Sequence, residues 1–219
     1  MPVPLSVVIL GTGGGFVLLE LARRRFHIFK ELLDITGGMI LFVIFLPAIL
    51  LCALVIKLAD PAGPILYRQV RVGLNGRLFT IYKLRTMYVD AEAHGRAQLA
   101  DKDDPRVIPV CRWMRRSHMD ELPQLANIML GEMSLVGPRP ERPEIFEELC
   151  RVLPRFEDRL AVKPGLTGMA QIYNGYDTDI VSVRQKLAFD LQYIQNMCLT
   201  LELKLLLATV AKFHDREAH

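Results

Sequence analysis

A run of eighteen uncharged residues, 39–56, constrains the fold of this chain more than any other feature of the sequence. If the run is helical, it is about 27 Å long, close to the minimum that crosses the hydrocarbon core of a bilayer. Pro47 lies near its centre, where a proline removes a backbone hydrogen bond and clashes with the preceding helical turn. We therefore expect a membrane helix that is kinked or broken at Pro47.

Basic residues flank this run on both sides. Those before it are Arg23, Arg24, Arg25 and Lys30, and those after it are Lys57, Arg68 and Arg71. Because Lys and Arg favour the cytoplasmic face of a membrane, a simple span fits this distribution poorly. Physical reasoning alone leaves two interpretations open: a helix that enters the membrane, bends at Pro47 and leaves on the same side, and an ordinary span with a proline kink.

The preceding apolar stretch, residues 3–22, contains the glycine-rich sequence GTGGG. This motif lacks the Lys-Ser/Thr ending of a phosphate-binding loop, so nucleotide binding is not expected there. A secretory signal is not expected either, because the basic residues follow the apolar stretch instead of preceding it. The favoured interpretation is a first membrane helix that ends at the Arg23–Arg25 cluster.

The composition indicates a folded, membrane-associated protein. Hydrophobic residues make up 51% of the 219 residues and mean hydropathy is +0.24, which excludes intrinsic disorder. The net charge of only +3 gives no electrostatic footprint for duplex nucleic acid. The four cysteines lie far apart, without a Cys-x-x-Cys pair, and are expected to be reduced thiols in a protein that faces the cytosol.

Beyond Asp60 the sequence predicts a small β-hairpin. Residues 64–72 and 77–86 are rich in β-formers and flank the turn sequence Gly73-Leu74-Asn75-Gly76. By the two-residue period of a strand, four side chains of the second run share one face: Phe79, Ile81, Lys83 and Arg85. The polar residues 88–105 are typical of a surface helix followed by a loop.

The segment HMDELPQLANIMLGEM carries two adjacent acids, Asp120 and Glu121. Since Pro123 is tolerated only in a first helical turn, the helix is expected to begin at Asp120 or Glu121 and to end at Gly131. Two interpretations of the acids are open. They either cap the helix and compensate its dipole, or they do chemistry.

Two stiff turns each present a cation. Arg139 lies between Pro138 and Pro140, and Lys163 opens the sequence KPGLTG. A rigid arginine is suited to bind a phosphate or carboxylate with two hydrogen bonds, although an exposed structural loop explains it equally well. Residues 183–213 read as helical and suit either a membrane interface or burial against the protein core.

Taken in order, six stretches resemble the bacterial sugar transferase family of monotopic phosphoglycosyl transferases. They are YRQVRVG, FTIYKLRTM, DPRV, MRRSHMDELPQLANIMLGEMSLVGPRPE, KPGLTGMAQI and KLAFDLQYIQN. The resemblance implies an α+β, mostly helical fold with a re-entrant membrane helix broken at a proline, a small β-hairpin and amphipathic interfacial helices. It divides the chain into an N-terminal apolar segment, 1–27, a re-entrant helix, 28–58, and a catalytic domain, 59–219.

The resemblance also implies a reaction. Sugar-1-phosphate passes from a UDP-sugar to polyprenyl (undecaprenyl) phosphate, with release of UMP, and this starts the assembly of a bacterial glycan. The pathway stays open among capsule, exopolysaccharide, lipopolysaccharide and protein glycosylation. The catalytic dyad and Mg²⁺ ligands are then Asp120 and Glu121, with Asp120 as the nucleophile that carries a covalent phosphosugar. The positions expected to bind substrate are Lys83, Arg85, Arg115, Pro138, Arg139, Pro140, Lys163 and Asp190.

The implied location is the bacterial inner membrane, with the catalytic domain on the cytoplasmic face and no nucleic-acid partner. Whether the chain forms a homo-oligomer stays open, as does the identity of the sugar. The chain departs from the family pattern in having His118-Met119, where Ser-Leu usually precedes the dyad. A different interpretation of the whole chain is a non-catalytic scaffold that binds polyprenyl phosphate or nucleotide.

Overall fold

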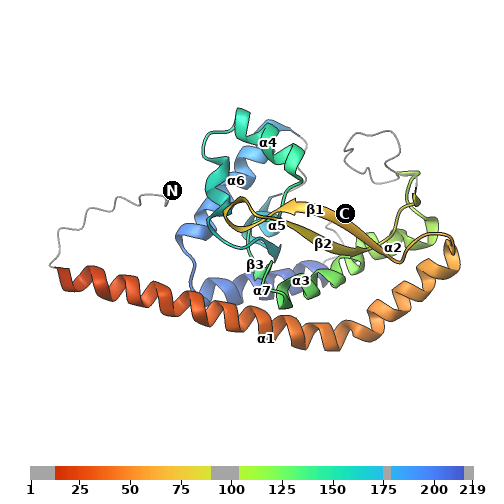
Figure 1. Ribbon diagram of the computed structural model, residues 1–219, viewed down its shortest axis with the longest axis horizontal. Coiled ribbons are helices and arrows are strands. Elements are labelled where there is room, and N and C mark those ends of the chain that lie inside the picture. Colours follow the sequence, from red (N-terminus) through yellow and green to blue (C-terminus); the bar gives the residue numbers. More distant parts are fainter. Residues whose placement is uncertain (1–12, 90–103, 175–178, 215–219) are drawn as a thin grey trace.

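The long helix α1 (Gly13–Ala59) lies along one side of the molecule, and the other labelled helices and strands are gathered on one side of it (Figure 1). The computed structural model describes residues 13–89, 104–174 and 179–214, with side chains from residue 26 to residue 212. Most of the segment 88–105, expected to be a surface helix and loop, lies outside these ranges. The fold is mostly helical with a small antiparallel sheet, as expected.

Within the described part of the chain, α1 is the one helix that is long and apolar enough to cross a membrane. Its most apolar 18-residue stretch has a mean hydropathy of 3.2, and only 11% of that stretch is buried. Large side chains such as Val43, Ile44 and Leu50 are exposed along it. An apolar surface of this extent requires a covering, and the described residues leave it open.

Helix α1 is continuous through Pro47 and through the Arg23–Arg25 cluster. In Figure 1 its orange part turns away from the axis of its red part. Pro47 lies inside this helix. A proline inside a helix removes one hydrogen bond and forces a bend, which explains the turn. The expected discontinuity is therefore a bend in one helix, and the helix expected to end at the basic cluster runs on into the next segment.

The predicted hairpin is confirmed. Strands β1 (Leu66–Val72) and β2 (Leu78–Leu84) pair in antiparallel register, with Leu66 opposite Leu84. The turn between them includes a short 3₁₀ helix, η1 (Leu74–Gly76). Asn75 and Gly76 adopt positive φ angles of 53° and 78° there, which asparagine and glycine tolerate best.

The acidic segment is built differently from the single helix that the sequence predicts. Following η3 (Pro109–Cys111) and α2 (Arg112–Arg116), a 3₁₀ helix, η4 (Met119–Gln124), contains both acids and leads into α3 (Leu125–Met129). Asp120 therefore does not occupy the cap position. His118 does, with a φ of 53° and no side-chain capping bond. Gly131, with a φ of 74°, follows the end of α3 as expected.

A short parallel pair that the sequence did not predict joins β3 (Ser134–Val136) to β4 (Gly165–Thr167). The two segments approach closely because Gly165 lies against the backbone of Gly137, where an added Cβ would be 2.1 Å from the Gly137 nitrogen. The loop that carries Arg139 follows β3 directly, and Lys163 lies two residues before the start of β4. The remaining elements are α4 (Pro143–Val152), η5 (Phe156–Ala161), α5 (Met169–Tyr173), α6 (Ile180–Gln195) and α7 (Leu199–His214).

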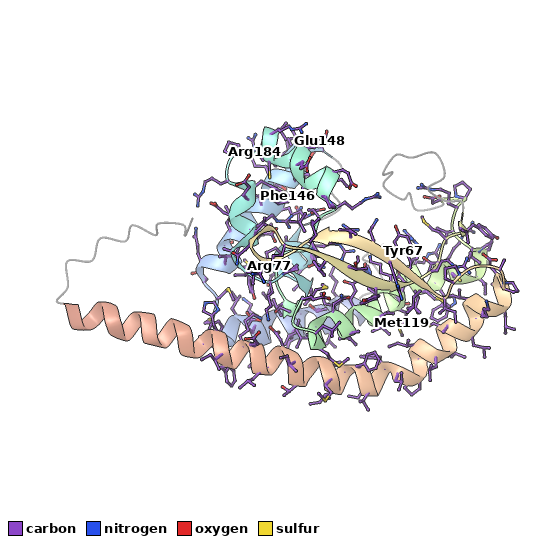
Figure 2. All side chains as sticks on the ribbon, in the orientation of Figure 1. Tyr67, Arg77, Met119, Phe146, Glu148 and Arg184 are labelled. Atoms are coloured by element: carbon purple, nitrogen blue, oxygen red, sulfur yellow. The ribbon has the colours of Figure 1, made fainter. Side chains whose placement is uncertain are left out.

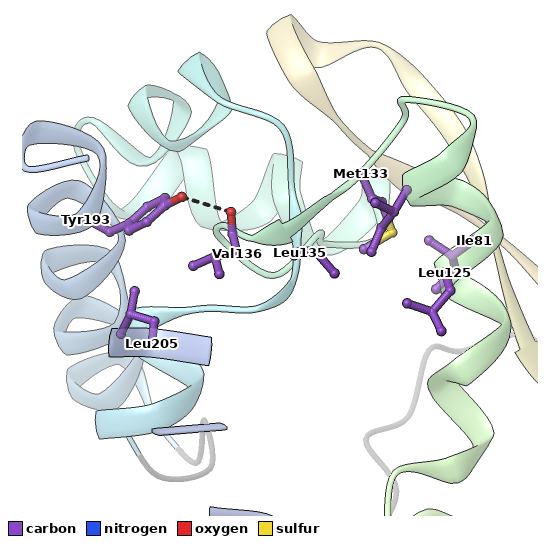
Figure 3. Close-up of a cluster of buried hydrophobic side chains, with 8 residues drawn as sticks. Ile81, Leu125, Met133, Leu135, Val136, Tyr193 and Leu205 are labelled. Carbon is purple, nitrogen blue, oxygen red and sulfur yellow. Dashed lines mark hydrogen bonds between the residues drawn. The ribbon is translucent and has the colours of Figure 1, made fainter. Parts of the chain in front are cut away.

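The main hydrophobic core joins β2, α3, β3 and the two C-terminal helices (Figure 3). Ile81 and Leu125 lie on one side of this cluster, and Tyr193 and Leu205 lie on the other. The Tyr193 hydroxyl donates a hydrogen bond of 2.9 Å to the carbonyl oxygen of Val136. The single helical stretch expected at 183–213 consists of two helices, α6 and α7. Helix α7 buries Leu205 in this core, while its Leu203, Leu207 and Val210 side chains are exposed.

Candidate active site

Asp120 and Glu121 lie side by side in η4, between the hairpin and α1. Only 8% of Asp120 and 9% of Glu121 is accessible to solvent. Met119, just before them, packs against the cluster that contains Cys52 and Ile56 of α1, and Figure 2 shows its side chain between the hairpin and this helix. Two adjacent buried carboxylates carry a desolvation cost that ordinary surface acids do not. The charged groups near each acid therefore determine its pKa.

Glu121 is held by two cations. Its Oε1 accepts from the Lys83 ammonium at 2.7 Å and from Arg139 Nη2 at 2.6 Å, and its Oε2 accepts from Arg139 Nη1 at 3.1 Å. Burial alone would raise the pKa of Glu121, but Arg139 and Lys83 together hold that pKa well below its usual range. Glu121 is therefore ionised throughout the physiological range and fixes the positions of both cations.

The pKa values of the two cations shift in opposite directions in this site. Burial and the nearby Arg139 charge lower the pKa of Lys83, although Glu121 counteracts them. The charge of Glu121 instead raises the pKa of Arg139 above its already high value. Lys83 reaches the site from β2 and Arg139 from the loop after β3, so the acidic pair joins two parts of the chain that are distant in sequence.

Asp120 has a different environment from its neighbour. Across the described residues, no cation lies within ion-pair distance of its carboxylate. Burial and the charge of Glu121 raise its pKa to about 6, while the more distant Lys83 and Arg115 lower it. Arg115 lies on α2, and its Nη1 is 3.4 Å from the Thr86 hydroxyl. Among the described residues Asp120 is thus a buried carboxylate with cations nearby but no ion-pair partner, a state typical of reactive acids.

The acidic pair is where the sequence predicts a magnesium ion, and the two acids differ in how open they are to one. No group of three His, Cys, Asp or Glu side chains suited to a metal is present among the described residues. Mg²⁺ is commonly bound through one or two carboxylates together with waters and substrate phosphates. Within the described part of the chain no cation pairs with the Asp120 carboxylate, which leaves it open to this role, whereas both oxygens of Glu121 already accept hydrogen bonds from cations.

Asp190, expected to bind substrate, lies in a second buried cluster behind the Arg139 loop. Its Oδ2 accepts from Arg159 Nη2 at 2.6 Å, and each of these side chains is only 2% exposed. Pro138 and Pro140 bracket Arg139 as expected and line a small cavity together with Arg159. Asp190 is therefore connected to the site through Arg159.

Lys163 and Arg85 have partners on or just after α1 instead of in the dyad. The Lys163 ammonium is 2.5 Å from Glu31 Oε1. Arg85 Nη1 is 2.5 Å from Asp60 Oδ2, and its Nε donates to the carbonyl of Pro64. Both cations thus connect the α1 region to the rest of the chain.

Sequence reasoning missed three side chains near the site: the buried Asn127 and Arg159, and the partly buried Glu141. Asn127 accepts a hydrogen bond from the Tyr82 nitrogen and donates one to the Thr80 carbonyl, which fixes β2 against α3. Its place within the LANIM segment and that of Glu141 beside the Pro-Arg-Pro turn were available signals. Arg159 belongs to none of the quoted motifs.

Comparison with known proteins agrees with this arrangement. Residues 25–216 match the family described as Bacterial sugar transferase. A UDP-glucose:undecaprenyl-phosphate glucose-1-phosphate transferase of Caulobacter vibrioides is 42% identical over 87% of this chain and 71% of its own length. An undecaprenyl-phosphate glucose phosphotransferase of Komagataeibacter xylinus is 38% identical over 91% of this chain but only 39% of its own length.

A third relative is matched along most of both chains. The exopolysaccharide production protein PSS of Rhizobium leguminosarum is 35% identical over 84% of this chain and 94% of its own length. The family match covers far more than half of the chain and includes every element around the acidic pair. The chain therefore belongs to the bacterial sugar transferase family.

Proposed function

We propose that this protein transfers sugar-1-phosphate from a UDP-sugar to undecaprenyl phosphate, releasing UMP. The observation that carries the proposal is Asp120, a buried carboxylate without a direct counter-ion whose surroundings include Lys83, Arg115 and Arg139. Lys83 and Arg139, both paired with Glu121, and the more distant Arg115 suit a diphosphate substrate, since phosphoryl transfer depends mainly on positioning and charge neutralisation. The printed names of the Caulobacter and Komagataeibacter relatives support this reaction.

The proposed chemistry has two displacements at one phosphorus. In the first, an Asp120 oxygen attacks the β-phosphorus of the UDP-sugar, and the bond from that phosphorus to the bridging oxygen breaks. UMP leaves with the electron pair, and the sugar phosphate stays bonded to Asp120 as an acyl phosphate. In the second, an oxygen of undecaprenyl phosphate attacks the same phosphorus and restores the Asp120 carboxylate, giving undecaprenyl-diphosphate sugar.

Glu121 is suited to organise this reaction without entering it. It holds Lys83 and Arg139 within 2.7 Å of its own oxygens, so both cations are in position before a substrate arrives. A diphosphate that enters can share these cations, which costs little reorganisation. We expect Asp120 to hold Mg²⁺ jointly with the substrate phosphates. When bound, the ion would neutralise charge on the diphosphate and the leaving UMP.

Helix α1 supports the assignment of a membrane lipid as the acceptor substrate. The helix has an exposed apolar surface, and the acidic pair lies in an element packed against it. A lipid phosphate anchored in a membrane that contains α1 would therefore present its headgroup near η4. We accordingly place the protein at the bacterial inner membrane with the catalytic elements on the cytoplasmic face.

The test is UMP release by detergent-solubilised protein incubated with Mg²⁺, undecaprenyl phosphate and either UDP-glucose or UDP-N-acetylgalactosamine. UMP should appear with at least one donor and should be absent with Asp120→Asn. If the protein is a scaffold that only binds these substrates, neither the wild type nor Asp120→Asn would release UMP. Absence of UMP release by the wild type with every UDP-sugar of a panel would reject the enzymatic proposal in favour of a binding role.

A further inference from the structure

A fully buried arginine, Arg159, lies directly behind the loop that carries Arg139. Its side chain is 2% exposed, and two carboxylates neutralise it. Asp190 Oδ2 accepts from Arg159 Nε at 3.1 Å and from Nη2 at 2.6 Å, while Glu141 Oε1 accepts from Nη1 at 3.2 Å. With both carboxylates engaged, Arg159 has no surplus charge to offer to a substrate.

The same guanidinium also holds the backbone of Arg139. Arg159 Nη2 donates a hydrogen bond of 3.0 Å to the Arg139 carbonyl oxygen. Its guanidinium carbon lies 4.8 Å from the centre of the Phe156 ring, which fixes its remaining face. Arg159 therefore connects a rigid part of η5 and α6 to one peptide group of the active-site loop.

Other contacts complete the support of this loop. Arg71 Nη1 donates to the carbonyl oxygen of Pro140 at 3.0 Å, and Lys186 pairs with Glu141 at 2.7 Å. Because Pro138 and Pro140 fix φ on either side, the peptide of Arg139 is held from both directions. The position of the Arg139 guanidinium on Glu121 thus follows from where its backbone is held.

We propose that Arg159, itself held by Asp190, is a positioning residue that acts on the substrate diphosphate through Arg139. This inference rests on the proposed function, because it assigns the diphosphate as the ligand of Arg139. It predicts that Arg159 matters only while Arg139 is present. A merely structural role predicts instead that substitutions at the two positions act independently.

A double-mutant cycle measured by UDP binding separates these cases without requiring turnover. Arg159→Lys keeps the charge but cannot reach Asp190, Glu141 and the Arg139 carbonyl together, because its three donors sit on one nitrogen. Losing a charge-assisted hydrogen bond that positions Arg139 should weaken UDP binding by about tenfold. In an Arg139→Ala background the same substitution should change the Kd of UDP less than about twofold.

Two further variants keep the test decisive if Arg159→Lys fails to fold. Asp190→Asn preserves shape and weakens the hold on Arg159, so it should show the same dependence on Arg139. Arg155→Lys is the matched control and should leave the Kd of UDP unchanged. Arg155 lies four positions before Arg159, is mostly exposed and pairs with Asp158. Melting temperatures of all variants are recorded alongside.

The outcomes distinguish the two proposals. Equal weakening of UDP binding in both backgrounds, no weakening in the wild-type background, or no measurable UDP binding by an active wild-type protein would each overturn the positioning role alone. A wild-type protein that releases no UMP from any UDP-sugar would remove the proposed function, and this inference with it.

Discussion

Neutralising Asp120 and neutralising Glu121 should shift the stability of the protein in opposite directions, although each substitution should abolish turnover. Burial and the charge of Glu121 raise the pKa of Asp120 from 3.8 to about 6, so its ionised form destabilises the folded state. At about 1.4 kcal/mol for each tenfold change in acidity, the destabilisation reaches at most about 3 kcal/mol at neutral pH. Asp120→Asn should recover most of it.

The pH dependence of this gain has a defined sign. A carboxyl whose pKa is raised on folding costs nothing below its unfolded value near 4, and its cost grows until the pH passes about 6. The stability gain of Asp120→Asn over the wild type should therefore be complete at pH 7.5 and absent at pH 4. Glu121 behaves in the opposite way, because its lowered pKa means that its ionised form stabilises the fold.

Glu121→Gln leaves Lys83 and Arg139 buried with no carboxylate between them. Breaking a buried ion pair from one side costs about 3 to 5 kcal/mol. For a chain of this size, 1 kcal/mol corresponds to roughly 2 to 4 °C in Tm. At pH 7.5 we expect Asp120→Asn to melt several degrees above the wild type and Glu121→Gln to melt several degrees below it.

The assay is thermal unfolding in detergent followed by circular dichroism at pH 4, 5.5 and 7.5. Glu144→Gln, at a side chain that is 71% exposed, serves as the control and should change Tm by less than about 1 °C. A lower Tm for Asp120→Asn at pH 7.5, or a gain that persists at pH 4, would refute the argument from burial. A fully active Asp120→Asn protein would refute the catalytic assignment.

Three other predictions address the site and the membrane helix. The kcat/KM for UDP-sugar should rise with pH through an apparent pKa of about 6, as Asp120 ionises. Arg115→Met removes a cation that lowers the pKa of Asp120, so it should shift this rise to higher pH. If the rise stayed at the same pH, it would not report the ionisation of Asp120. Arg139→Lys should lower kcat/KM at least tenfold, since a point charge cannot replace a two-pronged contact, and near-normal kinetics would make the loop merely structural. Single cysteines at His27 and Lys57, both exposed, should resist an impermeant thiol reagent in intact cells and react after permeabilisation; labelling of one alone would indicate a true span.

Local signals in the sequence were enough to predict the hairpin but not the parallel pair. The hairpin follows from two β-forming runs around Asn75-Gly76, a turn that those two residues adopt by their own conformational preferences. Strands β3 and β4 have three residues each, and their pairing depends on the close approach of Gly137 and Gly165. No local pattern indicates that contact.

The acidic pair was located from the sequence, but its partners depend on the tertiary structure. Motif positions marked Lys83, Arg139, Lys163 and Arg85 as cations expected to bind substrate, and that role stays a prediction. In the structure Lys83 and Arg139 pair with Glu121. Lys163 and Arg85 pair instead with Glu31 and Asp60, acids that the motifs do not involve. A motif position identifies a cation, whereas only the fold determines which carboxylate it meets.

The buried pair of Asp190 and Arg159 shows the same limit. A run such as FEDRLAV is typical of a solvated surface, and nothing in it predicts an arginine that is 2% exposed. Such burial becomes favourable only because Asp190 and Glu141 reach Arg159 from α6 and from the active-site loop. The support of Arg139 was therefore visible only in the structure.

The most direct test of the account is mass spectrometry of the protein quenched after brief incubation with UDP-sugar and Mg²⁺ in the absence of undecaprenyl phosphate. We predict a phosphosugar on Asp120, found on the peptide that contains the acidic pair, lost on addition of undecaprenyl phosphate and absent from Asp120→Asn. An adduct on Glu121 would reverse the roles of the two acids. An Asp120→Asn protein that still turned over UDP-sugar would contradict the central claim.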